Sequence, residues 1–530
     1  MSQTDVLIIG AGPTGLTLAL WLHKQGVAVR IIDYAEGPSK NSRAVAVHAR
    51  VLELYQQIDL ADELDAFGYP LRASNIWIDG KHYSTVPLSD FGKKLTPYPY
   101  MLMLSQEDHE KILENRLQSL GVYVERCTKL KHYVEHVSKI TATLVRETDR
   151  REVIKVICDA SWIVGCDGAR SIVRHEIGAD FEGETYVPLF YIADIEAGPG
   201  DCCNPGFNGE AHIRMLGDKY NVILPFSNGK RIRLIGTTTP EDYKEKIDLS
   251  TPNPQLTFED VEPEIRAVTG IEIKKLHTFA TYRCHHRIAD KFRKGRAFIA
   301  GDAAHIHSPV GGQGMNTGIM DAVNLAWKLA AVIKNPGMSE ISQEKLLDSY
   351  EIERRTFAIN VIGATDQGFT LLTSKGFWPY LVRQWLLPYG VPIVTKLEYI
   401  KHQIFRRGSQ LVCTYRGSHL SEAVSGWGAV QPGDRLPWAK LDSSDNFSSL
   451  HHIAWQLHVY GYPPTALEKW CIVNDVLLTV IDWDPHHGKV GLRKNAVYLL
   501  RPDQYIAGIF EGRSVNSMLD DYFSSRELTY

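Results

Sequence analysis

Residues 6–15 of this 530-residue chain read Val-Leu-Ile-Ile-Gly-Ala-Gly-Pro-Thr-Gly. The first four form a short apolar run rich in β-branched residues, which is typical of a strand buried inside a parallel sheet. The leucines and alanines after the glycines predict a mostly apolar helix that ends near Gly26. Residues 27–32, Val-Ala-Val-Arg-Ile-Ile, predict a second strand that ends at Asp33. The stretch therefore predicts a β-α-β unit.

The glycine spacing in this unit has a physical reason. The first glycine permits a tight turn, the second lets the backbone approach a pyrophosphate, and the third lets the helix pack closely on the strand. The acid after the second strand suits a ribose and disfavours a 2′-phosphate, so the unit favours FAD or NAD over NADP. The alternative is a glycine-rich turn that binds nothing. The predicted dinucleotide-binding residues are Gly10, Gly12, Pro13, Thr14, Gly15 and Asp33.

A second motif follows an apolar strand that is predicted to end at residue 165. It reads Cys166-Asp167-Gly168, and the helix after it is predicted to hold Arg170 and Ser171 in its first turn. An acid and a glycine therefore follow a second predicted strand end.

A third motif lies near the middle of the chain, where residues 300–318 read Ala-Gly-Asp-Ala-Ala-His-Ile-His-Ser-Pro-Val-Gly-Gly-Gln-Gly-Met-Asn-Thr-Gly. Residues 296–300 predict a strand, and apolar residues with helical spacing predict a helix that begins at Met315 and Asn316. His305 and His307 do not predict a metal site, because no third ligand has a motif spacing. We expect them to pack near the turn. Asp302 either contributes to a binding site at this turn or is an ordinary helix cap.

The three motifs resemble, in their order and spacing, those of the class A flavoprotein monooxygenases. These are single-component FAD enzymes of the p-hydroxybenzoate hydroxylase and phenol hydroxylase type, and the resemblance spans about residues 1–360. Residues 501–505, Arg-Pro-Asp-Gln-Tyr, also resemble the end of the C-terminal thioredoxin-like domain found in phenol hydroxylases and aromatic polyketide hydroxylases. This region has no C-x-x-C, so we expect no redox activity of its own.

The resemblance implies further FAD contacts. It implies that Asp302 binds the ribityl hydroxyls, and that glycines 311, 312 and 314 let the backbone lie against the isoalloxazine ring. Amides at the start of the following helix would stabilise the negative charge that develops on the reduced ring. The implied contacts beyond the first unit are Arg43, Gln106, Asp167, Gly301, Asp302, Pro309, Gly311, Gly312, Gly314, Met315 and Asn316.

The resemblance gives specific roles to three of these side chains. Arg43 resembles the arginine that reaches the pyrophosphate or the flavin, and Gln106 the glutamine that touches the diphosphate or the ribityl chain. For both, the alternative is a surface residue. Asp167, together with Arg170, resembles a motif that serves both FAD and NAD(P)H. Arg50 is either a second cation near this region or a solvated helix residue.

The resemblance also implies the chemistry. NADPH or NADH docks transiently, reduces FAD and leaves, and the resemblance favours NADPH. Reduced FAD reacts with O2 to give a C4a-hydroperoxide, whose distal oxygen hydroxylates a phenolic or other electron-rich aromatic ring. The substrate pocket should exclude water and help to deprotonate a substrate hydroxyl.

Short alternating segments in the middle of the chain predict an antiparallel sheet that covers this pocket. His212 and Arg214 share one face of a predicted strand, and Tyr220 shares a face with Val222 on the next. The predicted catalytic or substrate-orienting residues are His212, Arg214, Tyr220, Tyr282, Arg283 and Pro309, the last beside the flavin. The alternative for the first three is a solvent-facing position.

Composition sets the broad class. Hydrophobic and charged residues make up 44% and 23% of the chain, the net charge is −4, and no long basic run exists, which argues against nucleic acid as a partner. The eight cysteines lack disulfide or zinc spacing. No signal peptide or membrane span is predicted. We expect a cytoplasmic monomer or homodimer that acts on a small aromatic molecule and O2.

The expected fold class is α/β, with a Rossmann-like FAD-binding domain, an inserted antiparallel-sheet substrate domain and a C-terminal thioredoxin-like domain. The FAD-binding domain is predicted to comprise residues 1–75, 100–180 and 285–360, and the substrate domain residues 76–99 and 181–284. A helical connector is predicted at residues 361–410 and the C-terminal domain at residues 411–530.

Other activities remain open at this point. The same scaffold performing epoxidation or Baeyer–Villiger oxidation of a polyketide-like or alkaloid-like metabolite is the nearest alternative, because the chemistry depends on the pocket contents. An NAD-dependent dehydrogenase using only the first unit, or a flavin-fold protein without catalysis, is disfavoured by the Gly301-Asp302 motif.

Overall fold

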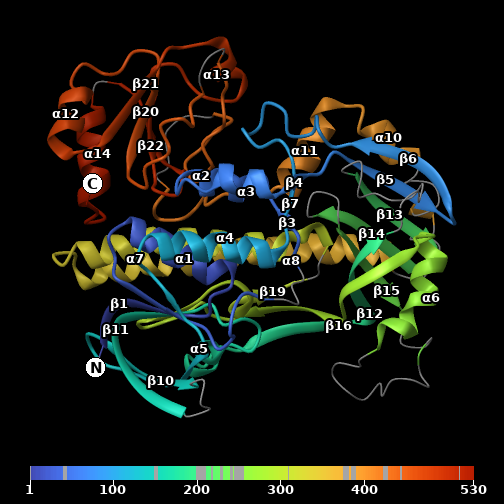
Figure 1. Cartoon of the computed structure of the whole chain (residues 1–530). Coiled ribbons are helices and arrows are strands. Elements are labelled where there is room, and N and C mark those ends of the chain that lie inside the picture. The colour runs from blue at the N-terminus through green and yellow to red at the C-terminus, as the bar shows by residue number, and fades with distance from the viewer. Residues whose placement is uncertain are drawn as a thin grey trace.

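The computed structural model places three large sheets and one small three-stranded sheet around a central layer of helices (Figure 1). It describes residues 2–39, 44–147, 153–197, 210–216, 219–226, 231–238, 243, 256–307, 310–373, 381–382, 389–421, 428–441, 445–512 and 514–529.

The first sheet has a parallel centre, in which the carboxyl ends of four strands form one row. Ile9 lies opposite both Ile32 and Gly165, and Gly165 lies opposite Ile299. The strand order is β17-β18-β11-β1-β2-β8, with β10 and β9 added to β11 in antiparallel fashion. Its strands are β1 (Ser2–Ile9), β2 (Val29–Ile32), β8 (Val124–Glu125), β9 (Thr128–Glu135), β10 (Ile140–Glu147), β11 (Val153–Gly165), β17 (Arg293–Lys294) and β18 (Ala297–Ile299).

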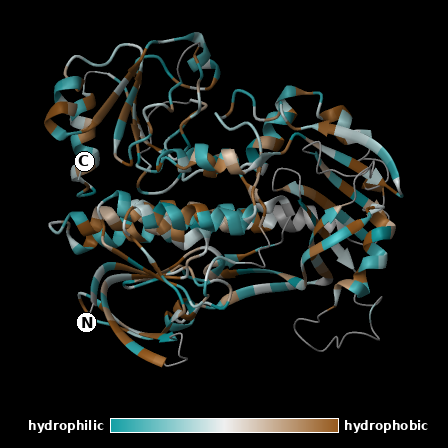
Figure 2. Ribbon diagram, viewed as in Figure 1, coloured by the Kyte–Doolittle hydropathy of each residue, from teal (hydrophilic) through white to brown (hydrophobic). Residues whose placement is uncertain are grey.

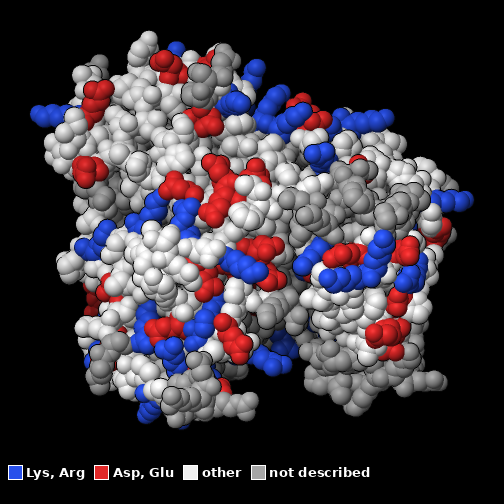
Figure 3. All heavy atoms as spheres, in the orientation of Figure 1, with Lys and Arg blue, Asp and Glu red and all other residues white. Residues whose placement is uncertain are grey.

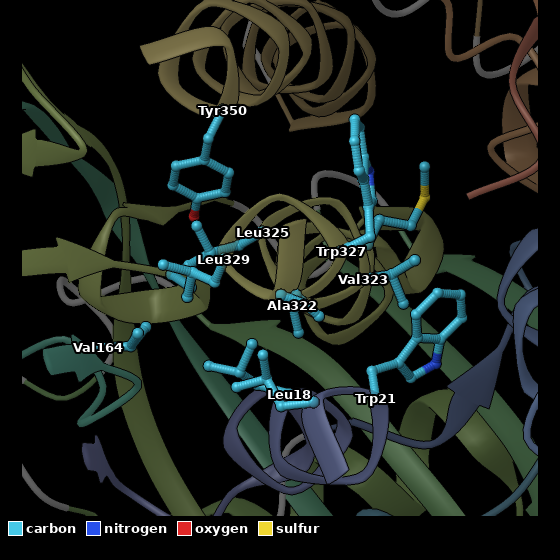
Figure 4. Packing of buried hydrophobic residues seen from close by; sticks show 14 of the residues in the cluster. Leu18, Trp21, Val164, Ala322, Val323, Leu325, Trp327, Leu329 and Tyr350 are labelled. Atoms are coloured by element: carbon cyan, nitrogen blue, oxygen red, sulfur yellow. The ribbon is translucent and has the colours of Figure 1, made fainter. Parts of the chain in front are cut away.

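Four helices form the central layer: α1 (Pro13–Lys24), α4 (Gln106–Ser119), α7 (Gln313–Lys334) and α8 (Glu340–Thr373). Ser105 caps the start of α4, because its Oγ accepts a hydrogen bond from Asp108 N at 3.1 Å. Helix α7 is buried on all sides, since α1 packs below it and α8 above it (Figure 4). Leu18 and Trp21 of α1 and Tyr350 of α8 point toward it.

Close backbone approach explains two glycines of the first unit. Gly10 has φ +102°, and a side chain there would lie 2.3 Å from the carbonyl oxygen of Cys166. A side chain on Gly15 would lie 2.0 Å from the carbonyl oxygen of Gly10. Both positions therefore require glycine for the turn and the helix to meet.

The second sheet carries the strands that were predicted in the middle of the chain. Its order is β19-β16-β12-β15-β14-β13-β5-β6, and neighbouring strands are antiparallel, as expected, except that β13 pairs with β5 in parallel. One face packs against α6 (Phe258–Thr269) and the other against α10 (Val391–Val394) and α11 (Glu398–Gly408). The strands are β5 (Ala73–Ile78), β6 (Lys81–Pro87), β12 (Phe181–Ala197), β13 (Glu210–Leu216), β14 (Lys219–Phe226), β15 (Arg231–Thr238), β16 (Ile273–Ala289) and β19 (His305–Ile306).

A four-stranded sheet forms the C-terminal part, in the order β21-β20-β22-β23. Strands β20 and β21 are parallel and joined through α12, whereas the other pairs are antiparallel. The resemblance to a thioredoxin-like domain stays a prediction. The elements are β20 (Gln456–Tyr460), α12 (Leu467–Asn474), β21 (Leu477–Ile481), α13 (Pro485–Lys489), β22 (Val497–Leu500), β23 (Ile506–Phe510) and α14 (Val515–Ser524).

Residues 470–473 form an apolar run that by sequence alone is typical of a strand, yet this segment lies in α12. Trp470 and Cys471 are buried, whereas Ile472 and Val473 are 82% and 72% exposed. In a short run whose residues are all apolar, no period of 3.6 is visible, so the sequence does not distinguish a helix from a strand.

Short elements link these parts. A three-stranded sheet, in the order β3-β7-β4, lies beside α2 and α3, and two 3₁₀ turns flank the third motif. The bounds are β3 (Ala46–Val47), α2 (Ala49–Gln56), α3 (Ala61–Phe67), β4 (Tyr69–Pro70), β7 (Leu102–Met103), α5 (Ile172–Glu176), η3 (Gly301–Ala303) and η4 (Val310–Gly312).

A buried ionic network docks the C-terminal part onto the helical layer. Arg501 donates to both carboxylate oxygens of Glu353, at 2.7 and 2.9 Å, and Lys328 Nζ donates to the same carboxylate at 2.8 Å. Burial acts to raise the pKa of Glu353, but the charges of Arg501 and Lys328 outweigh it and hold the pKa well below its usual range. Glu353 is therefore charged inside the protein and joins three segments.

Arg50 belongs to the same interface. It is fully buried and donates to Gln504 Oε1 at 2.7 Å and to the carbonyl oxygen of Asp503 at 2.8 Å. The alternative of a solvated helix residue is therefore wrong, whereas the alternative of a cation near the cofactor stays a prediction. Tertiary packing against residues more than 450 positions away buries it.

Apolar residues concentrate on the strands and inner helix faces (Figure 2), and charges of both signs are interspersed on the visible surface (Figure 3). Among the helices of the described residues, none is long and apolar enough to cross a membrane.

The contact at Gly15 predicts a selective effect of one methyl group. Gly15→Ala should lower the free energy of unfolding of the apoprotein by about 1–3 kcal/mol or more, because its Cβ meets backbone. Gly12→Ala is the matched control, since a Cβ at Gly12 meets no atom within 4 Å. Urea unfolding of both variants measures the difference, and equal stability would contradict the assigned packing.

The ionic network predicts a second stability effect. Glu353→Gln should cost about 3–5 kcal/mol of unfolding free energy, because Lys328 and Arg501 would remain buried without their counter-charge. Glu107→Gln, which breaks the surface pair with Lys111, should cost about 0–1 kcal/mol. Denaturant unfolding compares them, and a cost for Glu353→Gln as small as the surface control would refute the network.

Candidate functional site

The three sequence motifs meet in one row at the carboxyl edge of the parallel sheet. Gly10 N donates to the carbonyl oxygen of Ile32 at 2.8 Å, Cys166 N to that of Ile9 at 2.7 Å, and Ala300 N to that of Gly165 at 2.9 Å. The residues that follow each strand are therefore neighbours, although they are up to 290 positions apart in the sequence. This edge is where open α/β sheets bind their ligands.

The turn into α1 fits a diphosphate. Gly12 is the N-cap of α1, no side chain caps this end, and the first turn has no acid. Space lies open where a Cβ of Gly12 would stand. Pro13 occupies the first helical position, where its missing N–H is not needed. Uncapped amides beside open space suit an anionic oxygen.

The carboxylate of Asp33 is held in place by backbone amides. Its Oδ2 accepts from Ala11 N at 2.6 Å, and its Oδ1 accepts from Ala35 N at 2.8 Å. Arg126 lies 4.0 Å from Oδ2. The acid therefore braces the first glycine turn, and its remaining acceptor positions are compatible with ribose hydroxyls.

Asp302 lies in the 3₁₀ turn that follows β18. It is exposed, whereas Gly301 and Ala303 on either side are buried. Gly301 has φ +61°, and a side chain there would lie 2.6 Å from Thr14 Oγ1. A side chain on Gly318 of α7 would lie 2.5 Å from the same atom. Thr14 thus packs between two glycines, which brings the first and third motifs together.

The buried carboxylate of Asp321, on α7, binds the turn that carries Asp302. Asp321 Oδ2 accepts from Gly301 N at 3.0 Å and bonds to His305 Nε2 at 2.7 Å, and Oδ1 accepts from Arg354 Nε at 2.7 Å. Burial acts to raise the pKa of Asp321, but the charges of His305 and Arg354 outweigh it and lower the pKa. His305 therefore supports the turn.

The side chains in and after the second motif mainly form hydrogen bonds with backbone groups of the protein. Asp167 Oδ2 accepts from Ile172 N at 2.7 Å, at the start of α5, and burial raises the pKa of this carboxyl group. Arg170 is exposed. Arg174 donates to the carbonyl oxygens of Ala303 and Ala169, at 3.0 and 2.7 Å, and thereby ties the second motif to the third.

The glycine turn before α7 is held by two side chains. Gly311 and Gly312 have φ +77° and +62°, so L-residues are disfavoured there. Asn316 Oδ1 accepts from His48 N, and Asn316 Nδ2 donates to the carbonyl oxygens of Ala46 and Gly312. These bonds join the turn to β3.

His48 completes this contact. Its ring is fully buried, and Nε2 donates to the carbonyl oxygen of Gly311 at 3.1 Å, because a carbonyl can only accept. Burial lowers the pKa of His48 to about 4. The imidazole is therefore neutral near pH 7.

Helix α7 begins at Gln313, two residues before the predicted start, and its N-terminus has no side-chain cap and no acid in the first turn. Gly314 and Met315 lie in this turn, and a Cβ on Gly314 would meet His307 at 3.5 Å. This end therefore resembles the start of α1 in presenting uncapped amides.

The remaining predicted cofactor contacts have different outcomes. Gln106 lies at the start of α4, and its side chain donates to Glu110 Oε1 at 2.7 Å. Its backbone N–H donates to the carbonyl oxygen of Ala44 at 3.3 Å. Arg43 and Pro309 lie outside the described residues.

The predicted substrate residues lie on opposite faces of the second sheet. Tyr220 and Tyr282 belong to one apolar cluster with Met215 and Phe190, on the face toward α11. Arg214 lies opposite Asn221, so it and His212 point the other way, and Arg214 NH1 donates to the carbonyl oxygen of Val268 in α6 at 3.5 Å. The expectation that His212, Arg214 and Tyr220 act on one ligand is therefore wrong.

Tyr282 and Arg283 are likewise separated by strand alternation. Tyr282 stacks on Phe190, with ring centroids 5.7 Å apart, whereas Arg283 lies opposite Leu189, which packs on the α6 side. Of the predicted pair, Tyr282 shares the face of Tyr220.

The connector lies between this face and the glycine turn. Phe405 of α11 and Leu411 pack in the cluster of Tyr220. Gln313 Nε2 donates to the carbonyl oxygen of Gly408 at 3.0 Å, and Gln410 Nε2 donates to Gln313 Oε1 at 2.7 Å. The start of α7 and the apolar face of the second sheet are thus joined through residues 405–411.

Within the described residues, no group of three or more His, Cys, Asp or Glu side chains has the arrangement of a metal site. Sequence reasoning missed His48, Asp321, Arg174 and Arg354, which support the cofactor turns. One signal was present: Asp321 is the single acid of a mostly apolar helix, and such a residue is buried only with partners.

Comparisons with known proteins agree with this geometry. The family model described as an FAD binding domain matches residues 3–365. The chain is 33% identical to the 6-methylpretetramide 4-monooxygenase of Streptomyces rimosus, over 83% of this chain and 75% of that protein. It is 30% identical to the pentachlorophenol 4-monooxygenase of Sphingobium chlorophenolicum, over 98% and 96%.

A solved structure extends the similarity through the C-terminal part. The anhydrotetracycline hydroxylase of Streptomyces rimosus matches with a TM-score of 0.75 and 26% identity, over 99% of both chains.

His48 predicts a specific pH dependence. Its pKa is lowered in the folded state, so the unfolded state binds more protons between pH about 6.5 and 4, and stability falls as the pH drops through that window. The slope from this group is roughly 1.4 kcal/mol per pH unit.

In His48→Gln the amide can still donate to Gly311, and this slope should be absent. Urea unfolding of wild type and variant at pH 7, 6 and 5 measures it, with exposed His136→Gln as the control. Parallel curves for wild type and His48→Gln would show that His48 is not buried in its neutral form.

Proposed function

This chain belongs to the family of FAD-dependent aromatic monooxygenases, and on that premise we propose that it hydroxylates a phenolic or polyketide-like aromatic compound at the apolar face of its second sheet. The observation that carries the proposal is the convergence of three glycine-containing motifs beside that face. It is an oxidoreductase that uses FAD, and NAD(P)H is the reductant typical of the family.

The residues at the sheet edge fit FAD. We infer that the open space at Gly12 and the uncapped start of α1 receive the diphosphate, and that Asp33 receives the ribose. Asp302 is proposed to bind the ribityl hydroxyls, and the amides at the start of α7 to face the ring. When bound, FAD supplies electron transfer from NAD(P)H and the activation of O2.

The protein would orient the substrate and exclude water. The cluster of Tyr220, Tyr282 and Phe190 is apolar apart from its tyrosine hydroxyls and the Cys284 thiol. Burial raises the pKa of Tyr220 well above its usual value, so this side chain remains a neutral phenol. Tyr220 is therefore proposed to hydrogen-bond to a substrate oxygen and to orient the ring rather than to act as a base.

His212 is not proposed as the base. It faces α6, and burial together with nearby Arg214 lowers its pKa to about 4. The hydroxyl proton of a phenolic substrate would leave by another route, with the tyrosine hydroxyls as hydrogen-bond partners in the pocket.

Names of relatives support the substrate class. The two relatives above are named for a polycyclic pretetramide and for a chlorinated phenol, which are both electron-rich or phenolic ring systems. We propose NADPH as the preferred reductant and a cytoplasmic monomer or homodimer as the working form. The division into FAD-binding, substrate, connector and C-terminal domains is proposed with the boundaries expected from the sequence.

Substrate screening tests this function. The purified protein, loaded with FAD, is incubated with phenols and tetracyclic polyketides, and NADPH and NADH are compared. Substrate-dependent cofactor oxidation should accompany a product that carries one atom from isotopically labelled O2. The position of that oxygen distinguishes ring hydroxylation from epoxidation and Baeyer–Villiger insertion. NAD(P)H oxidation with hydrogen peroxide as the sole product across the panel would count against the proposed substrate class.

Tyr220 predicts a coupling effect. Tyr220→Phe keeps the ring but removes the hydroxyl, so the ratio of product formed to NADPH consumed should fall roughly tenfold, the cost of about one hydrogen bond. Tyr83→Phe, on the exposed edge strand β6, should leave the ratio unchanged. Product yield and NADPH consumption are measured together, and an unchanged ratio in Tyr220→Phe would remove this residue from the pocket.

A further inference from the structure

A cavity lies on the α6 face of the second sheet, opposite the face of Tyr220 that is proposed to bind the aromatic substrate. Its volume is about 190 Å³, and it is bounded by the β5–β6 turn, the end of β13 and the end of α6. Figure 1 shows α6 on the far side of this sheet from α7. Its lining includes Trp77, Asp79, Gly80, Arg214, Ala267 and Val268.

Arg214 lines this cavity, and few protein groups bind its guanidinium. The residue is 6% exposed, and its guanidinium lies 4.3 Å over the ring of Trp77. NH1 makes the long contact with the Val268 carbonyl oxygen, whereas Nε and NH2 have no hydrogen-bond partner among the described residues. No carboxylate of the described residues forms an ion pair with it. Buried donors without partners are costly, and those of a charged group are costlier than those of a neutral one.

The two atoms left without partners indicate the shape of a ligand. Nε and NH2 form the edge of guanidinium that binds a carboxylate through two parallel hydrogen bonds. The same two atoms do so elsewhere in this chain: Arg233 binds Asp194 at 2.7 and 2.7 Å, and Arg30 binds Glu125 at 2.6 and 2.8 Å. From this geometry we propose that Arg214 binds a small monocarboxylate in the cavity.

The surroundings favour a single negative charge. Trp77 Nε1 donates to His212 Nδ1 at 3.0 Å, which holds the indole over the guanidinium. Lys219, on the neighbouring strand, is paired with Glu264 at 3.1 Å. The carboxylate of Asp79 lies at the exposed rim and repels anions. A cavity lined by one guanidinium and one acidic residue suits a monoanion better than a dianion such as phosphate.

The test uses the full-length FAD-loaded protein with propionate, a carboxylate without an aromatic ring. The indole N–H resonance of Trp77, identified by its loss in Trp77→Phe, should shift saturably with propionate at constant ionic strength. Arg214→Lys keeps the charge but loses the two-point contact and should weaken binding at least tenfold. Ala267→Phe, at an exposed position on α6, should fill the cavity and weaken binding similarly, whereas Arg231→Lys on β15 should not.

Several results would overturn the proposal. These are the absence of a saturable shift with propionate, unchanged binding in Ala267→Phe, and phosphate binding more tightly than propionate. Ala267→Phe decides the outcome on its own where Arg214→Lys fails to fold. Because propionate is not a ring substrate, failure here leaves the monooxygenase proposal intact, and failure of oxygenation leaves this site intact.

Discussion

The buried carboxylate of Asp321 is the interaction on which the cofactor edge depends. It lies on α7, yet it binds the backbone of the Gly301 turn, the ring of His305 and the guanidinium of Arg354 on α8. A lone buried charge would be strongly unfavourable, so the three partners are needed together. The same helix therefore presents its uncapped end toward the cofactor region and fixes the turn that carries Asp302.

The network continues toward the C-terminal part. Arg354 also donates to Tyr415 at 3.0 Å, while Glu353, its neighbour on α8, binds Arg501. Two adjacent residues of one helix thus point to the cofactor turn and to the C-terminal sheet. The C-terminal part thus contributes Arg501 to the charges that Lys328 of α7 and Glu353 of α8 bury between the two helices.

Because side chains alternate along the strands of the second sheet, its tyrosines and its buried basic residues lie on opposite faces. Tyr220 and Tyr282 face an apolar cluster that the connector covers, and His212 and Arg214 face α6. Successive side chains of a strand point to opposite faces of the sheet. Residues of neighbouring strands can therefore line the same pocket only if their side chains lie on the same face. The sheet can therefore serve an oxygenation pocket on one face and a carboxylate site on the other.

Sequence alone determined the parallel β-α-β unit, the three cofactor motifs and the family, because glycine spacing, strand ends and helix starts are local and leave local patterns. It also predicted the strands that became β1, β2 and β18. It did not determine the face on which His212 lies, the burial of Arg50 against Gln504, or the helix at residues 470–473. Tertiary structure decided these, since sheet register and long-range charge pairing depend on residues hundreds of positions apart, whose contacts no local pattern encodes.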